Sequence, residues 1–258
     1  MHVTFLGTGS AMPTGQRVQT GLLLHAAGDS LLVDCGSGVL DALGRSQVGY
    51  EGVDTVLLTH HHLDHVSDLL VLMKARWLAG EETLTVAGPP GTPDLVRDLL
   101  DVHEYMQDRL ELTLREIEPD SAFELAGFEG AAAATRHSMP CNAYRLSHPR
   151  DGGAGQDPPV FGFSGDSEAF PELLEFFDGT AVLAHDCSFP DDVDVANHPT
   201  PSELGRALAD ADADIGRIYL THLYPHTDGE HEAMLESVAD HYDGDVRFAE
   251  DDLTFRLG

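Results

Sequence analysis

Short apolar stretches recur along the chain between turn-forming residues, a pattern typical of β-strands, and they alternate with stretches of helical periodicity. The predicted strands are Val3–Leu6, Gly21–His25, Ser30–Asp34, Val53–Thr59, Leu84–Ala87, Ala131–Arg136, Ala143–Leu146, Val160–Phe163, Ala181–Ala184, Arg217–Thr221, Val246–Phe248 and Leu253–Leu257. The predicted helices are Val39–Arg45, Val66–Leu78, Pro93–Met106, Pro171–Phe177, Pro201–Ala211 and Glu230–His241. Paired strands early in the chain, followed by strands that alternate with helices, indicate an α/β fold whose two sheets are covered by helices on their outer faces.

Local signals place some of the boundaries. Three predicted helices begin at a proline, whose preset φ and missing N–H suit the first helical turn. Thr92 and Thr200 precede two of these prolines and are predicted N-caps. The segment His148–Pro159, rich in Gly, Pro and Asp, is predicted to be a loop.

Length and composition favour one domain. At 258 residues with 42% hydrophobic content, the chain can bury a large core, and no low-complexity linker or internal repeat divides it. We therefore expect a single domain over residues 1–258. The segment Met1–Gly7 already has a strand pattern instead of a charged signal region, and no apolar run reaches transmembrane length, so we expect a cytoplasmic protein without membrane association.

The charge balance is strongly acidic. The chain has 45 acidic and 14 basic residues, a formal net charge of −31, and Lys74 is its only lysine. Carboxylates at this density favour a salt-loving source, since molar salt shortens the Debye length to ~3 Å and screens the repulsion. In dilute buffer such a surface would argue against nucleic-acid substrates, but in molar salt that argument loses most of its force.

Cysteine usage indicates a reducing compartment. The three cysteines, Cys35, Cys141 and Cys187, are far apart in the chain and show no paired metal spacing. We expect them to be small buried residues.

The chemistry of the chain centres on one short segment. His60, His62, Asp64 and His65 directly follow the predicted strand Val53–Thr59. Side chains alternate along a strand, so His60 and His62 are expected to project together, while His61 projects away, as a residue that supports the ligands or packs, and not as a ligand. One loop then offers two imidazoles to one metal and a carboxylate with an imidazole to a second, the plan of a two-metal hydrolytic centre.

Further ligands are predicted at other strand ends, where layered α/β folds place functional groups. His137, Asp166 and His222 each stand where a predicted strand gives way to a loop. Taken singly, each also fits a structural role, such as a turn cap for Asp166. Since a carboxylate can bridge two cations and an imidazole cannot, Asp166 is the predicted bridge.

The chain resembles the metallo-β-lactamase superfamily and, within it, the ribonuclease Z-like branch. The motif Thr59-His60-x-His62-x-Asp64-His65 carries the resemblance to the superfamily. The opening Phe5-Leu6-Gly7-Thr8-Gly9-Ser10-Ala11-Met12-Pro13, the Gly88-Pro89 turn, Ser164-Gly165-Asp166-Ser167, Asn197-His198-Pro199-Thr200 and Leu220-Thr221-His222-Leu223 carry the resemblance to the branch.

The resemblance implies an αββα four-layer sandwich, two zinc ions and phosphodiester hydrolysis. It places His60, His62 and His137 on one metal, Asp64, His65 and His222 on the other, and Asp166 between them. It also implies that His198 assists the leaving group or the scissile phosphate. Manganese and iron stay open as alternatives to zinc.

Two departures from the branch matter. The tRNA-processing enzymes insert a long exosite arm between the third ligand histidine and the bridging aspartate, whereas only 28 residues separate His137 from Asp166 here. Phe163 stands where those enzymes carry the glutamate that orients the leaving-group histidine. We therefore expect no grip on tRNA, and we expect His198 to lack its carboxylate partner.

The leading hypothesis is a zinc-dependent phosphodiesterase that hydrolyses small or cyclic phosphodiesters through a metal-activated hydroxide. Asp64 would orient or deprotonate the attacking water, and His198 would donate the proton. The alternatives are a ribonuclease Z-like RNA endonuclease, a lactone or thioester hydrolase, an iron-dependent oxidoreductase and a metal-stabilised binding module. RNA is open as a partner but not favoured, and a homodimer is open as well, because related enzymes are often dimers.

Overall fold

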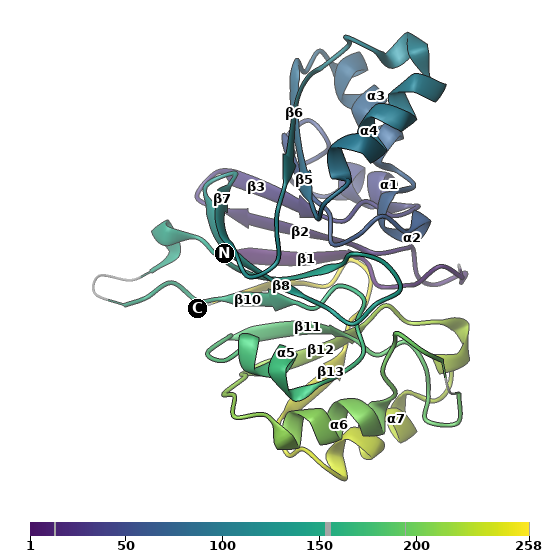
Figure 1. Ribbon diagram of the computed structural model, residues 1–258, viewed down its shortest axis with the longest axis vertical. Coiled ribbons are helices and arrows are strands. Elements are labelled where there is room, and N and C mark those ends of the chain that lie inside the picture. The colour runs from purple at the N-terminus through teal and green to yellow at the C-terminus, as the bar shows by residue number, and fades with distance from the viewer. Residues whose placement is uncertain (13, 153–155, 194, 258) are drawn as a thin grey trace.

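The computed structural model describes residues 1–12, 14–152, 156–193 and 195–257. Its strands form two seven-stranded sheets that lie face to face, and helices cover the outer face of each sheet (Figure 1). The predicted αββα sandwich is confirmed. Part of the predicted loop His148–Pro159, residues 153–155, lies outside the described ranges.

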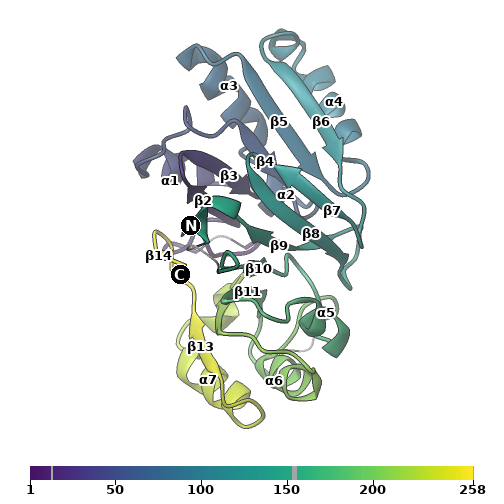
Figure 2. The ribbon, with the colours of Figure 1, turned by 90° about the vertical axis from the view of Figure 1, so that its left-hand side faces the viewer.

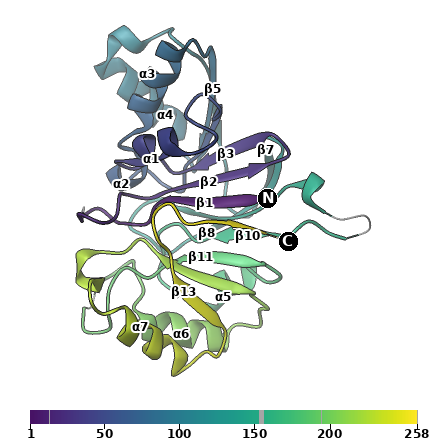
Figure 3. The same ribbon diagram turned by 180° about the vertical axis from the view of Figure 1, so that it is seen from behind.

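The first sheet has the order β14-β1-β2-β3-β4-β5-β6. In its antiparallel half, the two ends of the chain lie side by side, because β1 pairs with β14 (Figure 3). Its strands from β3 to β6 run parallel. The strands are β1 (His2–Gly7), β2 (Gly21–Ala26), β3 (Asp29–Val33), β4 (Thr55–Leu57), β5 (Thr83–Gly88), β6 (Glu111–Glu116) and β14 (Thr254–Arg256).

The second sheet has the order β13-β12-β11-β10-β9-β8-β7. Strands β7 to β10 are antiparallel neighbours, and β10 to β13 run parallel. The strands are β7 (Ala122–Leu125), β8 (Phe128–Ala134), β9 (Asn142–Ser147), β10 (Phe161–Phe163), β11 (Val182–Asp186), β12 (Arg217–Thr221) and β13 (Asp245–Phe248).

The helices lie in two outer layers at opposite ends of the molecule (Figure 1, Figure 2). The helices on the first sheet are α1 (Val39–Arg45), α2 (Leu63–Val66), α3 (Leu69–Ala79), α4 (Thr92–Val102) and the 3-10 turn η1 (Glu104–Met106). The helices on the second sheet are α5 (Pro171–Phe176), α6 (Pro201–Asp210) and α7 (His231–Ala239). Two further 3-10 turns, η2 (Pro149–Asp151) and η3 (Pro225–Thr227), are in loops. No helix among the described residues meets the length and hydropathy needed to cross a bilayer.

Three apolar layers hold the sandwich together. In β2, Leu22 and Leu24 face the core between the sheets while Leu23 faces the helices, because successive strand residues alternate between faces. Both faces of each sheet centre are therefore buried, which explains the continuous apolar runs in the sequence. A third cluster packs Ile218 of β12 against Leu204 of α6.

Several local predictions were wrong. The sequence analysis missed β6 and β7, which include three glutamates and in which exposed residues separate half-buried ones in β6 and buried ones in β7. The predicted helix Val66–Leu78 is two helices, and the Asp68 carboxylate between them accepts hydrogen bonds from the backbone of Gly38 and Leu40, at 2.9 and 3.0 Å.

The two predicted N-caps had different outcomes. Thr92 is the first residue of α4, and Gly91 is its N-cap. Thr200 does cap α6, and the Glu203 carboxylate returns to accept from the Thr200 backbone N–H at 2.9 Å.

The parallel strands direct their carboxyl ends to one edge of the sandwich. Strands β3 and β4 end there in the first sheet, and β10, β11 and β12 end there in the second. The Tyr144 hydroxyl donates across the sheets to the Leu58 carbonyl at 2.8 Å, and the Asn142 N–H donates to the Thr59 carbonyl at 3.0 Å. These bonds hold the ligand-bearing ends of the two sheets together.

Candidate metal centre

The His60 to His65 segment lies at this edge, but it is not a continuation of a strand. Strand β4 ends at Leu57, and His62 precedes the short helix α2. Strand alternation therefore does not explain why His60 and His62 converge. The loop turns both rings inward, while His61 is bonded to Thr92, with 2.8 Å between Nε2 and Oγ1.

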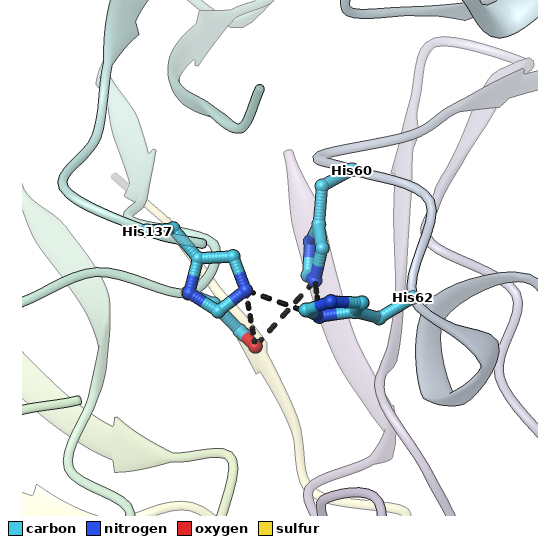
Figure 4. Close-up of side chains that lie close together, drawn as sticks. His60, His62 and His137 are labelled. Atoms are coloured by element: carbon cyan, nitrogen blue, oxygen red, sulfur yellow. Dashed lines mark hydrogen bonds and ion pairs between the residues drawn. The ribbon is translucent and has the colours of Figure 1, made fainter. Parts of the chain in front are cut away.

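Three imidazoles from two sheets converge on one point (Figure 4). Nδ1 of His62 lies 3.0 Å from Nε2 of His60 and 3.1 Å from Nε2 of His137. An oxygen of Asp166 lies 3.6 Å from His60 Nε2 and 3.9 Å from His137 Nε2. Three nitrogens and one carboxylate oxygen therefore surround a position that could hold a cation.

A second group lies on the other side of Asp166. His222 Nε2 lies 3.1 Å from an Asp64 oxygen, and His65 Nε2 lies 3.8 Å from the same oxygen. The Asp166 carboxylate reaches this group as well, with 3.3 Å from Oδ1 to His65 Nε2 and from Oδ2 to His222 Nε2. One buried carboxylate thus faces both groups, as the bridge predicted for Asp166 requires.

The nitrogen spacing fits zinc. Two nitrogens bound tetrahedrally to one zinc at about 2.0–2.1 Å lie about 3.4 Å apart, close to the separations around His62 Nδ1. Among the described residues the buried Nε2 of His65 makes no hydrogen bond, although Nδ1 of the same ring is held by Asp34 at 2.7 Å. A bound cation would satisfy this nitrogen.

The electrostatics of the centre favour positive charge. Burial opposes protonation of His65, but the carboxylates of Asp166 and Asp34 outweigh it and raise the His65 pKa well above its ordinary value. Burial likewise opposes ionisation of Asp166, yet the nearby imidazoles of His222, His65 and His60 hold its pKa well below the usual range. Burial lowers the pKa of His60. Carboxylates that attract a proton to one imidazole attract a divalent cation for the same reason.

Buried residues behind the ligands orient them. Asp34, at the end of β3, accepts from the Thr59 N–H at 2.7 Å and from the Thr59 hydroxyl at 2.8 Å, in addition to its bond with His65. On the other side, the Ser188 hydroxyl lies 2.9 Å from His222 Nδ1 and donates to Asp186 at 2.5 Å. Such outer partners fix the ring orientation of metal-binding histidines.

The backbone at His222 is held in a conformation unusual for a residue other than glycine. Its φ is +59°, and the next residue, Leu223, donates to the Thr8 carbonyl at 2.9 Å. Gly9 also forms a β-bridge with Leu223. The glycine-rich segment after β1 therefore supports the metal loop directly.

The expectation that His198 lacks a carboxylate partner was wrong. Phe163 is buried and supplies no carboxylate, but the Nδ1 of His198 lies 2.7 Å from Oδ2 of Asp186. Burial opposes protonation of His198, but the Asp186 carboxylate outweighs it and raises the pKa to about 9. The His198 ring stacks on that of His222, with centroids 5.3 Å apart and 12° between the planes. A histidine–aspartate pair is thus held next to the centre.

Sequence reasoning missed Asp34, Asp186 and Ser188. A weak signal existed, because Asp34 and Asp186 also end strands at the edge that holds the other ligands. Their carboxylates are completely buried, which a single sequence does not show. The three cysteines are free and buried, as expected.

Comparisons with known proteins agree with this geometry. Ribonuclease Z of Methanopyrus kandleri is 29% identical over 254 residues, which cover 88% of this chain and 88% of that protein. Ribonuclease Z of Haloferax volcanii is 26% identical over 299 residues, covering 97% of this chain and 93% of that protein.

Solved structures share the fold. The metallo-beta-lactamase fold protein YhfI from Bacillus subtilis superposes with a TM-score of 0.82 at 27% identity, over 99% of each chain. The short form of human tRNase Z superposes with a TM-score of 0.79 at 20% identity, over 100% of both chains, and supports the fold alone.

A family model described as Anti-Pycsar protein Apyc1 matches residues 1–233. Together with the clusters of histidine and aspartate, these matches identify a metal-dependent hydrolase of the metallo-β-lactamase fold. The chain belongs to the Anti-Pycsar protein Apyc1 family, as a metallo-β-lactamase-fold protein related to ribonuclease Z.

Proposed function

We propose that this protein is a zinc-dependent phosphodiesterase that hydrolyses cyclic nucleotides. The observation that carries the proposal is the 2.7 Å contact between His198 Nδ1 and Asp186 Oδ2 beside two clusters of ligands that Asp166 faces from between them. A phosphodiester needs charge neutralisation on its phosphate and a proton for its leaving oxygen. The family match supports a cyclic nucleotide as the diester.

The ligand roles follow from the two clusters. His60, His62 and His137 would hold one cation, Asp64, His65 and His222 would hold the other, and Asp166 would bridge them. Three imidazoles on one position favour zinc over magnesium or calcium, which prefer oxygen ligands. When bound, two such cations lower the pKa of a coordinated water and neutralise phosphate charge.

The protein's own groups would then handle the protons. Burial opposes ionisation of Asp64, but the neighbouring imidazoles of His222 and His65 outweigh it and lower the Asp64 pKa. Asp64 can therefore accept from and orient an attacking water. His198, with a pKa of about 9, carries its proton at neutral pH and would release it to the leaving oxygen as the ester bond breaks.

The second candidate is an RNA endonuclease, favoured by the relatives described as Ribonuclease Z. The interval between His137 and Asp166 counts against a tRNA substrate. The interval holds only 28 residues, and β9, η2 and β10 take up 12 of the 25 described ones, which leaves little room for an exosite arm. A lactone or thioester hydrolase has less support, because the family match and the relatives described as Ribonuclease Z favour a phosphodiester.

A substrate panel tests the proposal. Zinc-loaded protein in about 2 M KCl would be offered 3′,5′-cyclic nucleotides, a precursor tRNA and a lactone. We expect turnover of cyclic nucleotides that a chelator abolishes and zinc restores, with manganese and iron as comparison metals. His60→Ala should lose activity while it keeps the far-UV circular dichroism of the wild type. Cleavage of the tRNA alone, or of no diester, would contradict the proposal.

We also propose a homodimer that forms through the outer face of α3. Val71, Leu78, Val102 and Tyr105 are 50%, 68%, 78% and 52% exposed, and Lys74 lies over the Tyr105 ring. Among the described α-helices, α3 alone has no acidic residue in its first turn, and none of its eleven residues is acidic. Two chains of net charge −31 meet with least repulsion there.

Light scattering after size exclusion in about 2 M KCl tests the dimer. We expect twice the chain mass of 27.8 kDa for the wild type and the single mass for Leu78→Asp. Val195→Asp, at a residue 39% exposed outside this face, is the matched control and should stay dimeric. A monomeric wild type would contradict the proposal.

We also propose that the protein is cytoplasmic, and its free cysteines support a reducing compartment.

A further inference from the structure

Three aromatic side chains form a surface beside the centre, here called the aromatic shelf: Phe189, Tyr224 and His226. Phe189 and Tyr224 stack with centroids 4.4 Å apart and 25° between their planes. The centroid of the His226 ring lies 5.5 Å from that of Phe189 and 6.5 Å from that of Tyr224. None of the three is a candidate metal ligand.

The aromatic shelf adjoins the reacting groups. The Tyr224 ring lies 5.8 Å from that of His222 and 6.1 Å from that of His198, centroid to centroid. Phe189 lies 6.1 Å from His198. A ligand whose phosphate occupies the metal centre would therefore have an aromatic surface within reach of its remaining atoms.

The aromatic shelf is rigid and partly open. Phe189 is only 6% exposed, whereas Tyr224 is half-buried and His226 is exposed. The Tyr224 backbone donates to Ser188 at 3.3 Å and accepts from the Thr227 hydroxyl at 2.8 Å. A buried ring thus backs a fixed, accessible one. Packing alone would explain Phe189, but it does not explain an open tyrosine next to a histidine beside the centre.

We propose that the aromatic shelf binds the nucleobase of the substrate by stacking on Tyr224. The inference rests on the proposed function, because it assumes a nucleotide at the metal centre. An uncharged base suits this surface, since every base offers a π-face to an aromatic ring.

Steady-state kinetics on two substrates test the stacking. The substrates are a 3′,5′-cyclic nucleotide and a six-membered cyclic alkyl phosphate that carries no base. Tyr224→Ala should raise KM for the nucleotide about 5- to 150-fold, the equivalent of about 1–3 kcal/mol for one stacked base. Its kcat/KM should fall at least fivefold more for the nucleotide than for the base-free phosphate. Tyr224→Phe, which keeps the ring, should stay close to the wild type.

Tyr50→Ala is the matched control, because Tyr50 is half-buried and precedes β4, whereas the metal centre follows β4. Equal losses on both substrates in Tyr224→Ala, or a Tyr224→Phe variant as impaired as Tyr224→Ala, would overturn the inference.

A binding measurement separates this inference from the proposed function. Calorimetric titration of zinc-loaded protein with a nucleoside 5′-monophosphate needs no turnover. We expect weaker binding to Tyr224→Ala than to the wild type and to Tyr50→Ala. If the wild type hydrolyses no cyclic nucleotide but shows this difference, the proposed function fails and the aromatic shelf stands. Equal affinities, or no binding by the wild type, would overturn the aromatic shelf while any hydrolysis remained unaffected.

Discussion

At the scale of single residues, one buried carboxylate links two parts of the site. Asp186 holds His198 through one oxygen and, through Ser188, holds the ring of His222 with the other. The side chain is completely buried, so its negative charge is unscreened and acts on both imidazoles. The orientation of a candidate ligand and the proton on the candidate acid therefore depend on the same group.

Asp186→Asn tests this dependence. The amide keeps the shape but removes the charge that holds a proton on His198, so we expect kcat to fall about 10- to 100-fold. His198→Ala should cause a loss of similar or larger size, and the double variant should be little worse than the worse single variant. Steady-state kinetics of the four proteins measure this. Losses that simply multiply would show that the two residues act separately.

His185, on β11 beside Asp186, gives a pH prediction. The residue is completely buried, its Nδ1 lies 2.7 Å from the Asp186 carbonyl, and its Nε2 has no hydrogen-bond partner in the part of the chain that the structure describes. Burial lowers its pKa, so below about pH 6.5 the unfolded chain binds a proton that the folded chain does not. The contribution of neutral, buried His185 to the unfolding free energy is therefore complete above about pH 6.5. It is lost as the pH falls from there towards the pKa of His185 in the folded chain.

His185→Asn removes this titration while the amide can still donate to the Asp186 carbonyl. Urea unfolding of metal-free protein in high salt, at about pH 7.5 and pH 5.5, should show a smaller loss of unfolding free energy in the variant than in the wild type. The other titrating groups are common to both proteins, so the difference reports His185. An equal loss in both would contradict the lowered pKa.

At the scale of elements, the turn after β3 sets the position of the ligand helix α2. The Cys35 N–H donates to the His65 carbonyl at 2.7 Å, and the Asp68 N–H donates to the Cys35 carbonyl at 2.9 Å. A Cβ at Gly36 would collide with the Asp64 carbonyl oxygen. Gly36, which has no side chain, thus allows the turn after β3 to approach α2 closely, and this approach sets the position of Asp64.

Gly36→Ala should therefore displace Asp64 and weaken metal binding at least about tenfold, while the fold persists. Gly44→Ala is the matched control, because Gly44 lies in α1 with open space around its Cα. That change should raise helix propensity, stabilise the protein by up to about 1 kcal/mol and leave metal affinity as it was. Competition with a zinc chelator measures affinity. Equal affinities in Gly36→Ala and the wild type would contradict the contact.

Element prediction from sequence succeeded where one physical signal dominated. The buried runs around Leu22 to Leu24 and Leu31 to Val33 show strands because both faces are covered. It failed at β6 and β7, whose sequences are polar: β6 is held by parallel pairing with β5, 28 residues earlier, and β7 by its hairpin with β8. It also extended strand alternation to His60 and His62, although β4 ends at Leu57; both residues do reach the centre.

At the scale of the whole molecule, charge is the dominant feature. A net charge of −31 on 258 residues opposes the compact state, and the repulsion is long-ranged at low ionic strength. Much of the exposed charge has no partner of opposite sign, since acidic residues outnumber basic ones by 45 to 14. We propose that the protein is adapted to molar salt, where screening removes this cost.

Thermal unfolding should therefore depend strongly on salt. Between about 0.1 and 3 M KCl the Debye length shrinks from about 10 Å to less than about 3 Å, so we expect Tm to rise by tens of degrees or the protein to unfold at the low end. Differential scanning calorimetry across the series measures this, with an uncharged osmolyte as the control for excluded volume. A Tm that is flat or falls with KCl would contradict adaptation to salt.

The sequence by itself determined the layered α/β architecture, the acidic character and the set of candidate ligands, because periodicity, composition and the spacing of His60 to His65 are local properties of the chain. The tertiary structure decided what surrounds those ligands. It gave His198 a carboxylate partner in Asp186, since Phe163 stands where the tRNA-processing enzymes carry the orienting glutamate. It also brought Phe189 against Tyr224 beside the centre. These pairings depend on parallel strands that end at one edge of two facing sheets, and residues far apart in the chain meet there only once both sheets have formed.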